Sequence, residues 1–120
     1  MRQSLIVLAL VSGLSAAFRP VWHFEVTKSV PAAKAVLAES PAKLQVWFSQ
    51  MPAEAVSQIS LRDANDKNVP IGATKYVAAD KSMFAVPGPL PNGAYKLHWR
   101  GAGDDGHVQE GDIAFTVSKK

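Results

Sequence analysis

A chain of 120 residues with a mass of 12.9 kDa is long enough for one domain with a hydrophobic core and too short for two. Hydrophobic residues make up 48% of the chain and charged residues 19%, which excludes a disordered or fibrous protein. The formal net charge is only +3, and the basic residues are scattered without interleaved aromatics, so the pattern argues against nucleic-acid binding. The absence of cysteine excludes thiolate metal sites, disulfides and cysteine nucleophiles.

Residues 1–17 have the features of a secretory signal peptide. Arg2 precedes a mostly apolar stretch, residues 5–14, and the small residues 15–17 follow it. The apolar stretch is about half as long as the roughly 20 residues that cross a bilayer, so a signal peptide is favoured over a membrane anchor. We therefore expect residues 1–17 to be removed on export and residues 18–120 to form a soluble exported domain.

Short runs of alternating apolar residues, separated by Pro, Gly, Asn and Asp, predict an all-β protein. In each run every second residue is expected to face the core: Leu44, Val46 and Phe48; Ile59 and Leu61; Phe84 and Val86; Tyr95, Leu97 and Trp99; Ile113, Phe115 and Val117. Six or seven such strands without a long helix predict two packed antiparallel sheets, an immunoglobulin-like β-sandwich of about seven strands.

The segments between these runs are predicted to be turns and loops. Residues 63–66 and 88–93 have the composition of turns. Residues 34–39 are compatible with a helical turn or with an irregular edge, and the pattern does not decide between them. Residues 101–107 are rich in Gly and Asp and predict an exposed loop between the last two strands.

Three histidines are present, and His107 is the strongest candidate metal ligand among them. It follows Asp105 by two residues, and in an extended backbone this spacing brings both side chains to the same side. A carboxylate and an imidazole on a pliable loop suit a borderline cation such as Cu(II) or Zn(II). The same pattern is also compatible with a solvated turn that carries a surface histidine.

The remaining candidate groups favour packing or solvent exposure over chemistry. His98 alternates with the inward-facing Leu97 and Trp99, so its side chain is expected to point to solvent. Met51 and Met83 are far apart in the sequence and do not form the cluster that a thioether copper site needs. Nucleophilic catalysis has no support, because no serine stands in a G-x-S-x-G context.

Four stretches carry a family resemblance in their order and spacing: residues 23–31 (HFEVTKSVP), 44–49 (LQVWFS), 90–99 (LPNGAYKLHW) and 105–107 (DGH). On these stretches the chain resembles the copper-resistance protein CopC family, including its YobA-type members. The resemblance implies a Greek-key sandwich in the periplasm that holds one Cu(II) ion through His23, Asp105 and His107 and catalyses no reaction. It also implies a carrier or buffer in copper resistance, with an inner-membrane copper transporter as a candidate partner.

The sequence departs from the family at three points. Typical members begin with the histidine that corresponds to His23, whereas cleavage after Ala17 leaves residues 18–22 ahead of it, so the amine ligand is lost and weaker Cu(II) binding is expected. Gln50 replaces a common Glu, and Gly103 replaces a common Ser. These departures leave two other hypotheses open: a metal-free interaction module, and a copper-dependent oxidative enzyme, which the small chain and the missing amine disfavour.

Overall fold

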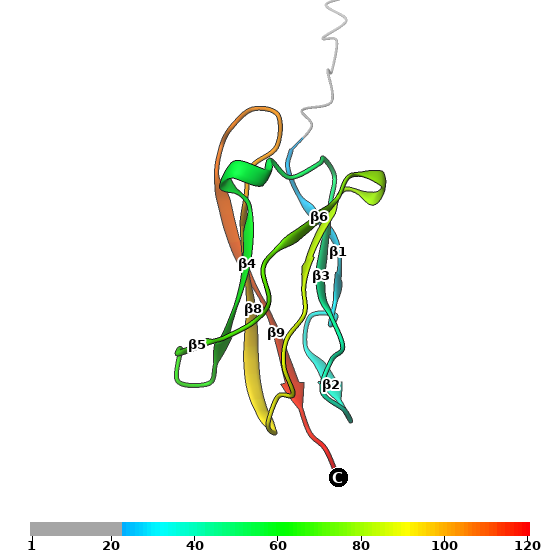
Figure 1. Ribbon diagram of the computed structural model, residues 1–120, viewed down its shortest axis with the longest axis vertical. Helices are drawn as coiled ribbons and strands as arrows, with labels where there is room; N and C mark the ends of the chain where they lie inside the picture. The colour runs from blue at the N-terminus through cyan, green and yellow to red at the C-terminus, as the bar shows by residue number, and fades with distance from the viewer. Residues whose placement is uncertain (1–22) are drawn as a thin grey trace, which may run out of the picture.

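Two β-sheets packed face to face make up residues 23–120, the part of the chain that the structure, a computed structural model, describes (Figure 1). The predicted signal peptide, residues 1–17, and residues 18–22 lie outside the described residues. No helix within the described range has the length and apolar character needed to cross a bilayer.

The smaller sheet has four strands and the larger sheet has five. In spatial order, the smaller sheet contains β1 (Val26–Val30), β3 (Leu44–Phe48), β7 (Ser82–Ala85) and β6 (Lys75–Val77). The larger sheet contains β2 (Ala35–Leu37), β9 (Gln109–Val117), β8 (Gly93–Gly101), β4 (Gln58–Asp63) and β5 (Asn68–Val69). Two 3₁₀ turns, η1 (Glu54–Val56) and η2 (Ala78–Asp80), lie in the connections.

The order of the strands confirms the predicted immunoglobulin-like Greek-key sandwich. The chain forms the hairpins β4–β5, β6–β7 and β8–β9, each within one sheet, and crosses to the other sheet after β1, β2, β3, β5 and β7. The four strands β1, β3, β7 and β6 oppose β4, β8 and β9, as in the seven-stranded immunoglobulin arrangement. The structure adds β2 and β5, which are too short, at three and two residues, to show an alternating pattern in the sequence.

Four of the five predicted core-facing runs are confirmed. Their side chains lie between the two sheets and are at most 8% exposed: Leu44, Val46, Phe48, Ile59, Leu61, Tyr95, Leu97, Trp99, Ile113, Phe115 and Val117. The long hairpin of β8 and β9 supplies six of them, because nine residues of each strand pair in register. Burial of these side chains is the main source of stability, since the chain has no disulfide.

The prediction was wrong for Phe84 and Val86. Met83 and Ala85 fill the core from β7 and are fully buried, whereas Phe84 is half-buried on the outer face and Val86 is 52% exposed. Residues 83–86 are all apolar, so their alternation cannot identify the inward face. The pairing with β3 decides it, because Met83 lies opposite Val46, which points into the core.

Residues 34–39, which the sequence left undecided, contain the three-residue edge strand β2. Lys34 has a φ of +65° and donates its backbone N–H to the carbonyl of Ala114 at 2.6 Å. The chain then runs parallel to β9 for three residues. The predicted alternative of an irregular edge is therefore closer to the structure than a helical turn.

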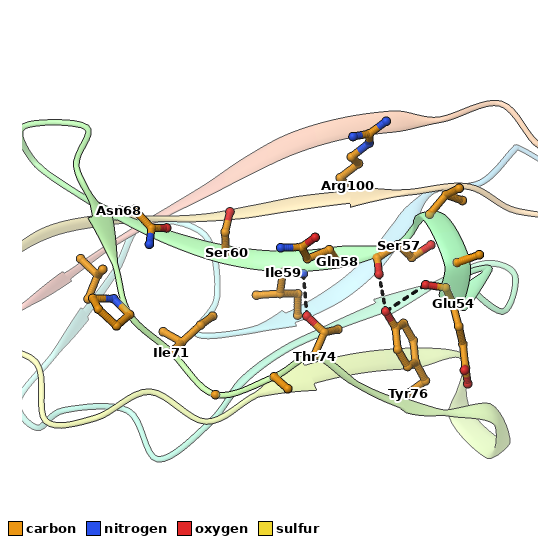
Figure 2. A pocket seen from close by; sticks show the side chains of 16 residues that line it. Glu54, Ser57, Gln58, Ile59, Ser60, Asn68, Ile71, Thr74, Tyr76 and Arg100 are labelled. Atoms are coloured by element: carbon orange, nitrogen blue, oxygen red, sulfur yellow. Dashed lines mark hydrogen bonds between the residues drawn. The ribbon is translucent and has the colours of Figure 1, made fainter.

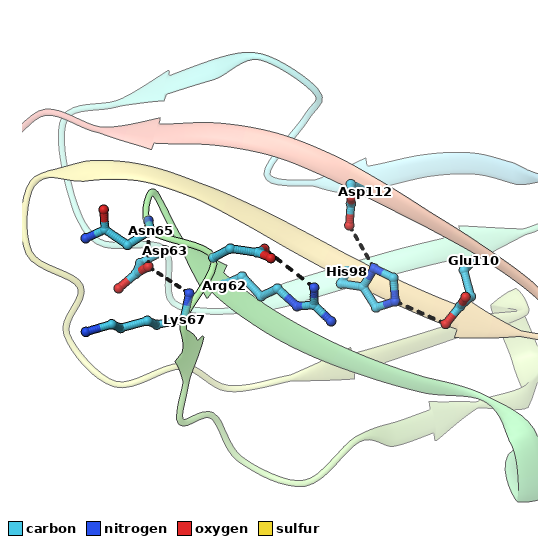
Figure 3. Close-up of polar contacts among 8 residues, drawn as sticks. Arg62, Asp63, Asn65, Lys67, His98, Glu110 and Asp112 are labelled. Carbon is cyan, nitrogen blue, oxygen red and sulfur yellow. Dashed lines mark hydrogen bonds and ion pairs between the residues drawn. The ribbon is translucent and has the colours of Figure 1, made fainter.

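The predicted turn at residues 63–66 is present, whereas residues 88–92 form an irregular connection into β8 in place of a regular turn. In the β4–β5 hairpin, Oδ1 of Asp63 accepts the N–H groups of Asn65 at 2.8 Å and Lys67 at 3.0 Å (Figure 3). Where the irregular connection enters β8, the hydroxyl of Tyr95 donates to the carbonyl of Pro91 at 2.7 Å. This bond is the counterpart of the tyrosine corner of immunoglobulin-like domains.

Candidate metal centre

A cluster of three aromatic rings forms the floor of the sandwich end that carries the 102–108 loop. Phe24 stacks on Phe48 with ring centroids 4.5 Å apart, and Trp99 packs edge-on against them at 6.2 Å and 5.4 Å. The ring of Phe24 also lies against Gly101 and Gly103, where an added Cβ would come within 3.0 Å and 3.2 Å of it. This aromatic floor therefore holds the first described residues against the start of the loop.

Ser49 and Gln50, which directly follow β3, join the N-terminal segment to the loop. The hydroxyl of Ser49 donates to the carbonyl of His23 at 2.5 Å and accepts the N–H of Glu25 at 3.0 Å. Oε1 of Gln50 accepts the N–H of Asp104 at 3.0 Å. The backbones of His23 and Asp104 are thus anchored to two adjacent residues.

The loop brings Asp105 and His107 together, as their spacing predicted. The N–H of His107 donates to Oδ1 of Asp105 at 3.0 Å, and Nδ1 of the same ring lies 3.6 Å from Oδ2. Gly106 has a φ of +73° and donates its N–H to the carbonyl of Gly103 at 3.1 Å, which closes the turn. The side chains of His107 and Asp105 are 86% and 60% exposed, so both are available to a ligand from solvent.

The first described residues, drawn in blue in Figure 1, lie at the same end of the sandwich as this loop, and His23 among them is exposed. Across residues 23–120, however, no three His, Cys, Asp or Glu side chains gather in positions that could hold one metal ion. The structure therefore brings together two of the three predicted ligands, Asp105 and His107, and does not gather His23 with them.

Sequence reasoning missed the roles of Phe24 and Ser49. Phe24 is apolar and precedes Val26 by two residues, so the alternation of β1 could have extended to it. Ser49 has no such signal, because its two bonds depend on the pairing of β1 with β3.

A depression at the foot of the loop is lined by Ser49, Gln50, Met51, Lys81, Asp104 and Asp105.

His98 stands apart from this site, on the outer face of the larger sheet. Its Nδ1 lies 2.7 Å from Oδ1 of Asp112, and its Nε2 lies 3.4 Å from Oε1 of Glu110 (Figure 3). The outward direction agrees with the prediction. The exposure is lower than predicted, at 19% of the side chain, because the two carboxylates of β9 flank the ring.

A polar groove runs along the edge of β4, on the side away from β8 (Figure 2). The hydroxyl of Tyr76 donates to the carbonyls of Glu54, at 3.2 Å, and Ser57, and the hydroxyl of Thr74 accepts the N–H of Ile59 at 3.1 Å. Burial, and secondarily the charge of Glu54, raise the pKa of Tyr76. Because these bonds close the open edge of β4, we assign the groove a structural role.

Fold and loop together define a small immunoglobulin-like domain with candidate metal ligands exposed at one end. Residues 26–118 match the model of the CopC domain. The chain belongs to the CopC family, which confirms the resemblance seen in the sequence.

Relatives and solved structures agree with this membership. Copper resistance protein C of Escherichia coli is 33% identical over 98% of this chain and 97% of its own length. Copper transport protein CutJ of Bacillus subtilis is 25% identical over 81% of this chain, which corresponds to 18% of CutJ. CopC from Methylosinus trichosporium OB3b superposes with a TM-score of 0.74 and 30% identity over 81% of this chain and 95% of that one. PcoC, a methionine-rich copper resistance protein from Escherichia coli, superposes with a TM-score of 0.70 and 32% identity over 80% of this chain and 99% of that one.

Proposed function

We propose that the protein binds one Cu(II) ion through His23, Asp105 and His107 and acts as a periplasmic copper carrier or buffer in copper resistance. The observation that carries the proposal is the exposed pair of Asp105 and His107, in a chain of the CopC family. Gln50 anchors the backbone of their loop at Asp104, and the adjacent Ser49 anchors the carbonyl of His23. Relatives named for copper resistance and copper transport support it. None of the relatives reported above is named for a reaction, which favours a binding protein over an enzyme.

The donor set suits Cu(II). Two imidazole nitrogens and one carboxylate oxygen supply three of the four positions of the tetragonal N,O geometry that Cu(II) prefers, and water or a backbone amide can fill the fourth. The described methionines offer no thioether cluster, because Met83 is fully buried in the core and Met51 is a single half-buried residue. Oxygen and nitrogen donors without sulfur favour Cu(II) over Cu(I).

Copper binding joins two parts of the chain that are far apart in sequence. His23 precedes β1, whereas Asp105 and His107 lie between β8 and β9. The ligands can meet only in the folded sandwich, so copper stabilises the fold by mass action. An inner-membrane copper transporter is the proposed recipient, and this is supported by the match of the chain to 18% of the longer protein CutJ.

The test is a titration with Cu(II) against a competing chelator, followed by EPR, on the full chain expressed with its own N-terminus. We expect one equivalent of Cu(II) with a type-2 signal and nitrogen couplings. His107→Ala should weaken binding about tenfold or more, because removing even a residue that only orients a ligand costs 10- to 100-fold. His98→Ala is the matched control and should bind as the parent does.

Equal affinity of His107→Ala and the parent would refute the assignment of this ligand. A parent protein that takes up no copper would leave the metal-free interaction module as the better hypothesis. Mass spectrometry of the same sample identifies the mature N-terminus and shows whether the amine of His23 is available.

A further inference from the structure

The outer face of the smaller sheet carries two aromatic rings that lysines cover. Nζ of Lys28 lies 4.7 Å from the ring centroid of Trp47, and Nζ of Lys43 lies 4.4 Å from that of Phe84. Lys75 is directly opposite Phe84 in the pairing of β6 with β7. We name this surface, made of Lys28, Lys43, Lys75, Trp47 and Phe84, the lysine face.

Apolar side chains continue the lysine face. Val30 lies opposite Gln45 on the same side of the sheet and is 42% exposed. Val86, two residues after Phe84, is 52% exposed. An outward aromatic with exposed valines beside it is apolar surface that the fold does not bury, and such surface marks interaction sites.

The positive charge of the lysine face is not neutralised within residues 23–120, where no carboxylate lies within salt-bridge distance of its three lysines. Asp80, at the edge of this face, accepts a 2.6 Å bond from the hydroxyl of Ser82 and a 3.1 Å bond from the indole N–H of Trp47. These bonds, that of Ser82 first, lower the pKa of Asp80, so its carboxylate adds one negative charge at the edge of the face. The three lysines outnumber this carboxylate, and none of them forms a salt bridge with it.

The outer face of the larger sheet is different, because carboxylates lie among its cations. Arg62 pairs with Asp66 at 3.5 Å, and Arg100 lies opposite Glu110 in the pairing of β8 with β9. His98 lies between two carboxylates, as described above. Lys96 and Arg100 on this face also make no salt bridge within the described residues, so the two faces differ in the number of carboxylates beside their cations.

The composition of the face identifies its partner. Lysine is depleted in protein–protein interfaces, where arginine and aromatics dominate, and the two arginines of the described residues lie on the other sheet. Lysines attract anionic lipid without needing a fixed geometry, and tryptophan is enriched at the level of the headgroups. We propose that the lysine face docks on the surface of an anionic phospholipid bilayer.

Such docking is weak and reversible. Each lysine near an anionic membrane contributes about a fivefold gain in partitioning, so three lysines give roughly 100-fold. The attraction is screened by salt over about 8–10 Å. The face runs along the flank of the sandwich, so the bound domain would lie along the membrane with the Asp105–His107 loop beside it rather than buried under it.

The test measures cosedimentation of the full chain with vesicles of pure phosphatidylcholine and of phosphatidylcholine with phosphatidylglycerol. A chelator is present throughout, so the result does not depend on the copper site. Lys28→Gln with Lys75→Gln removes two cations from the lysine face. Lys67→Gln with Lys96→Gln removes two exposed cations from the other sheet and its turn, and is the matched control.

We expect the parent to bind only the anionic vesicles, with binding that falls as salt is raised. The lysine-face variant should lose about 10- to 30-fold in partitioning, and the control should lose less than threefold. Equal losses in the two variants would overturn the proposal, since net charge alone would then explain binding. Undiminished binding of the lysine-face variant would overturn it in favour of residues outside this face. A parent that ignores the vesicles but cross-links through Lys28 to a carboxylate-bearing protein would assign the face to an acidic protein instead.

Discussion

The aromatic floor and the loop above it are neighbours with opposite properties. Phe24, Phe48 and Trp99 are at most 8% exposed and pack against one another, whereas the side chains of Asp105 and His107 are mostly in solvent and contact each other. The floor packs against the segments that carry the candidate ligands, and the loop carries the side chains that are proposed to bind the metal. Stability and metal affinity should therefore respond to different substitutions.

The largest effect is expected in the floor. Phe48→Ala removes a buried ring that contacts Phe24 and Trp99, and should lower the free energy of unfolding by about 3–5 kcal/mol. Urea denaturation followed by circular dichroism measures it. Phe84→Ala, on the outer face, should cost less than half as much, and equal costs would show that the floor is not the better packed region.

A smaller loss is expected where the floor meets the β8–β9 hairpin. A Cβ on Gly111 would come within 2.7 Å of Nε1 of Trp99, so Gly111→Ala must displace the indole ring and should cost about 1–3 kcal/mol. Gly88→Ala is the control, because nothing lies within 4 Å of its Cβ position. The same denaturation experiment compares the two, and a neutral Gly111→Ala would mean that the ring is free to move.

Substitutions in the loop should have little effect on stability and a larger effect on metal affinity. Asp105→Ala should change the free energy of unfolding by no more than about 0.5 kcal/mol, because the side chain is exposed, and should weaken Cu(II) binding about tenfold. Asp105→Asn keeps an acceptor for the N–H of His107 and removes the charge. Chelator competition on the three proteins separates the two contributions: similar losses in both variants point to the charge, and a loss in Asp105→Ala alone points to the turn.

The smallest effect concerns the flank of the sandwich at high pH. Burial raises the pKa of Tyr76 and Tyr95 in the folded protein above the ordinary value of 10.0. The stability that they contribute is complete below pH 10 and is lost as the pH rises through the folded-state pKa. Tyr76→Phe should make stability fall less steeply above pH 10, as urea midpoints across this range will show. An unchanged slope would contradict the assignment to Tyr76.

The sandwich could be predicted from the sequence because its core strands alternate clearly. Tyr95, Leu97 and Trp99 are separated by charged or polar residues, which leaves one choice of inward face. Residues 83–86 offer no such contrast, so the outward position of Phe84 depends on pairing with β3, and its ring is covered by Lys43 rather than by the core. Local pattern identifies a face only where the two faces differ.

The candidate site was predictable to a similar degree. The proximity of Asp105 and His107 follows from a spacing of two residues within one loop. The position of His23 depends on residues far away in the sequence, since Ser49 holds its carbonyl and the floor holds Phe24. A local sequence pattern cannot give the distance between His23 and the loop, so the approach of His23 to Asp105 and His107 stays a prediction.

The edges of both sheets have a consequence for the behaviour of the protein at high abundance. The outermost strands β2, β5 and β6 have three, two and three residues, and β1 is interrupted by a shift in register between Val26 and Lys28. A neighbouring molecule therefore finds no long row of unpaired backbone groups on which to add a strand. The edges therefore disfavour self-association through added strands at the high concentration that the proposed buffering role would require.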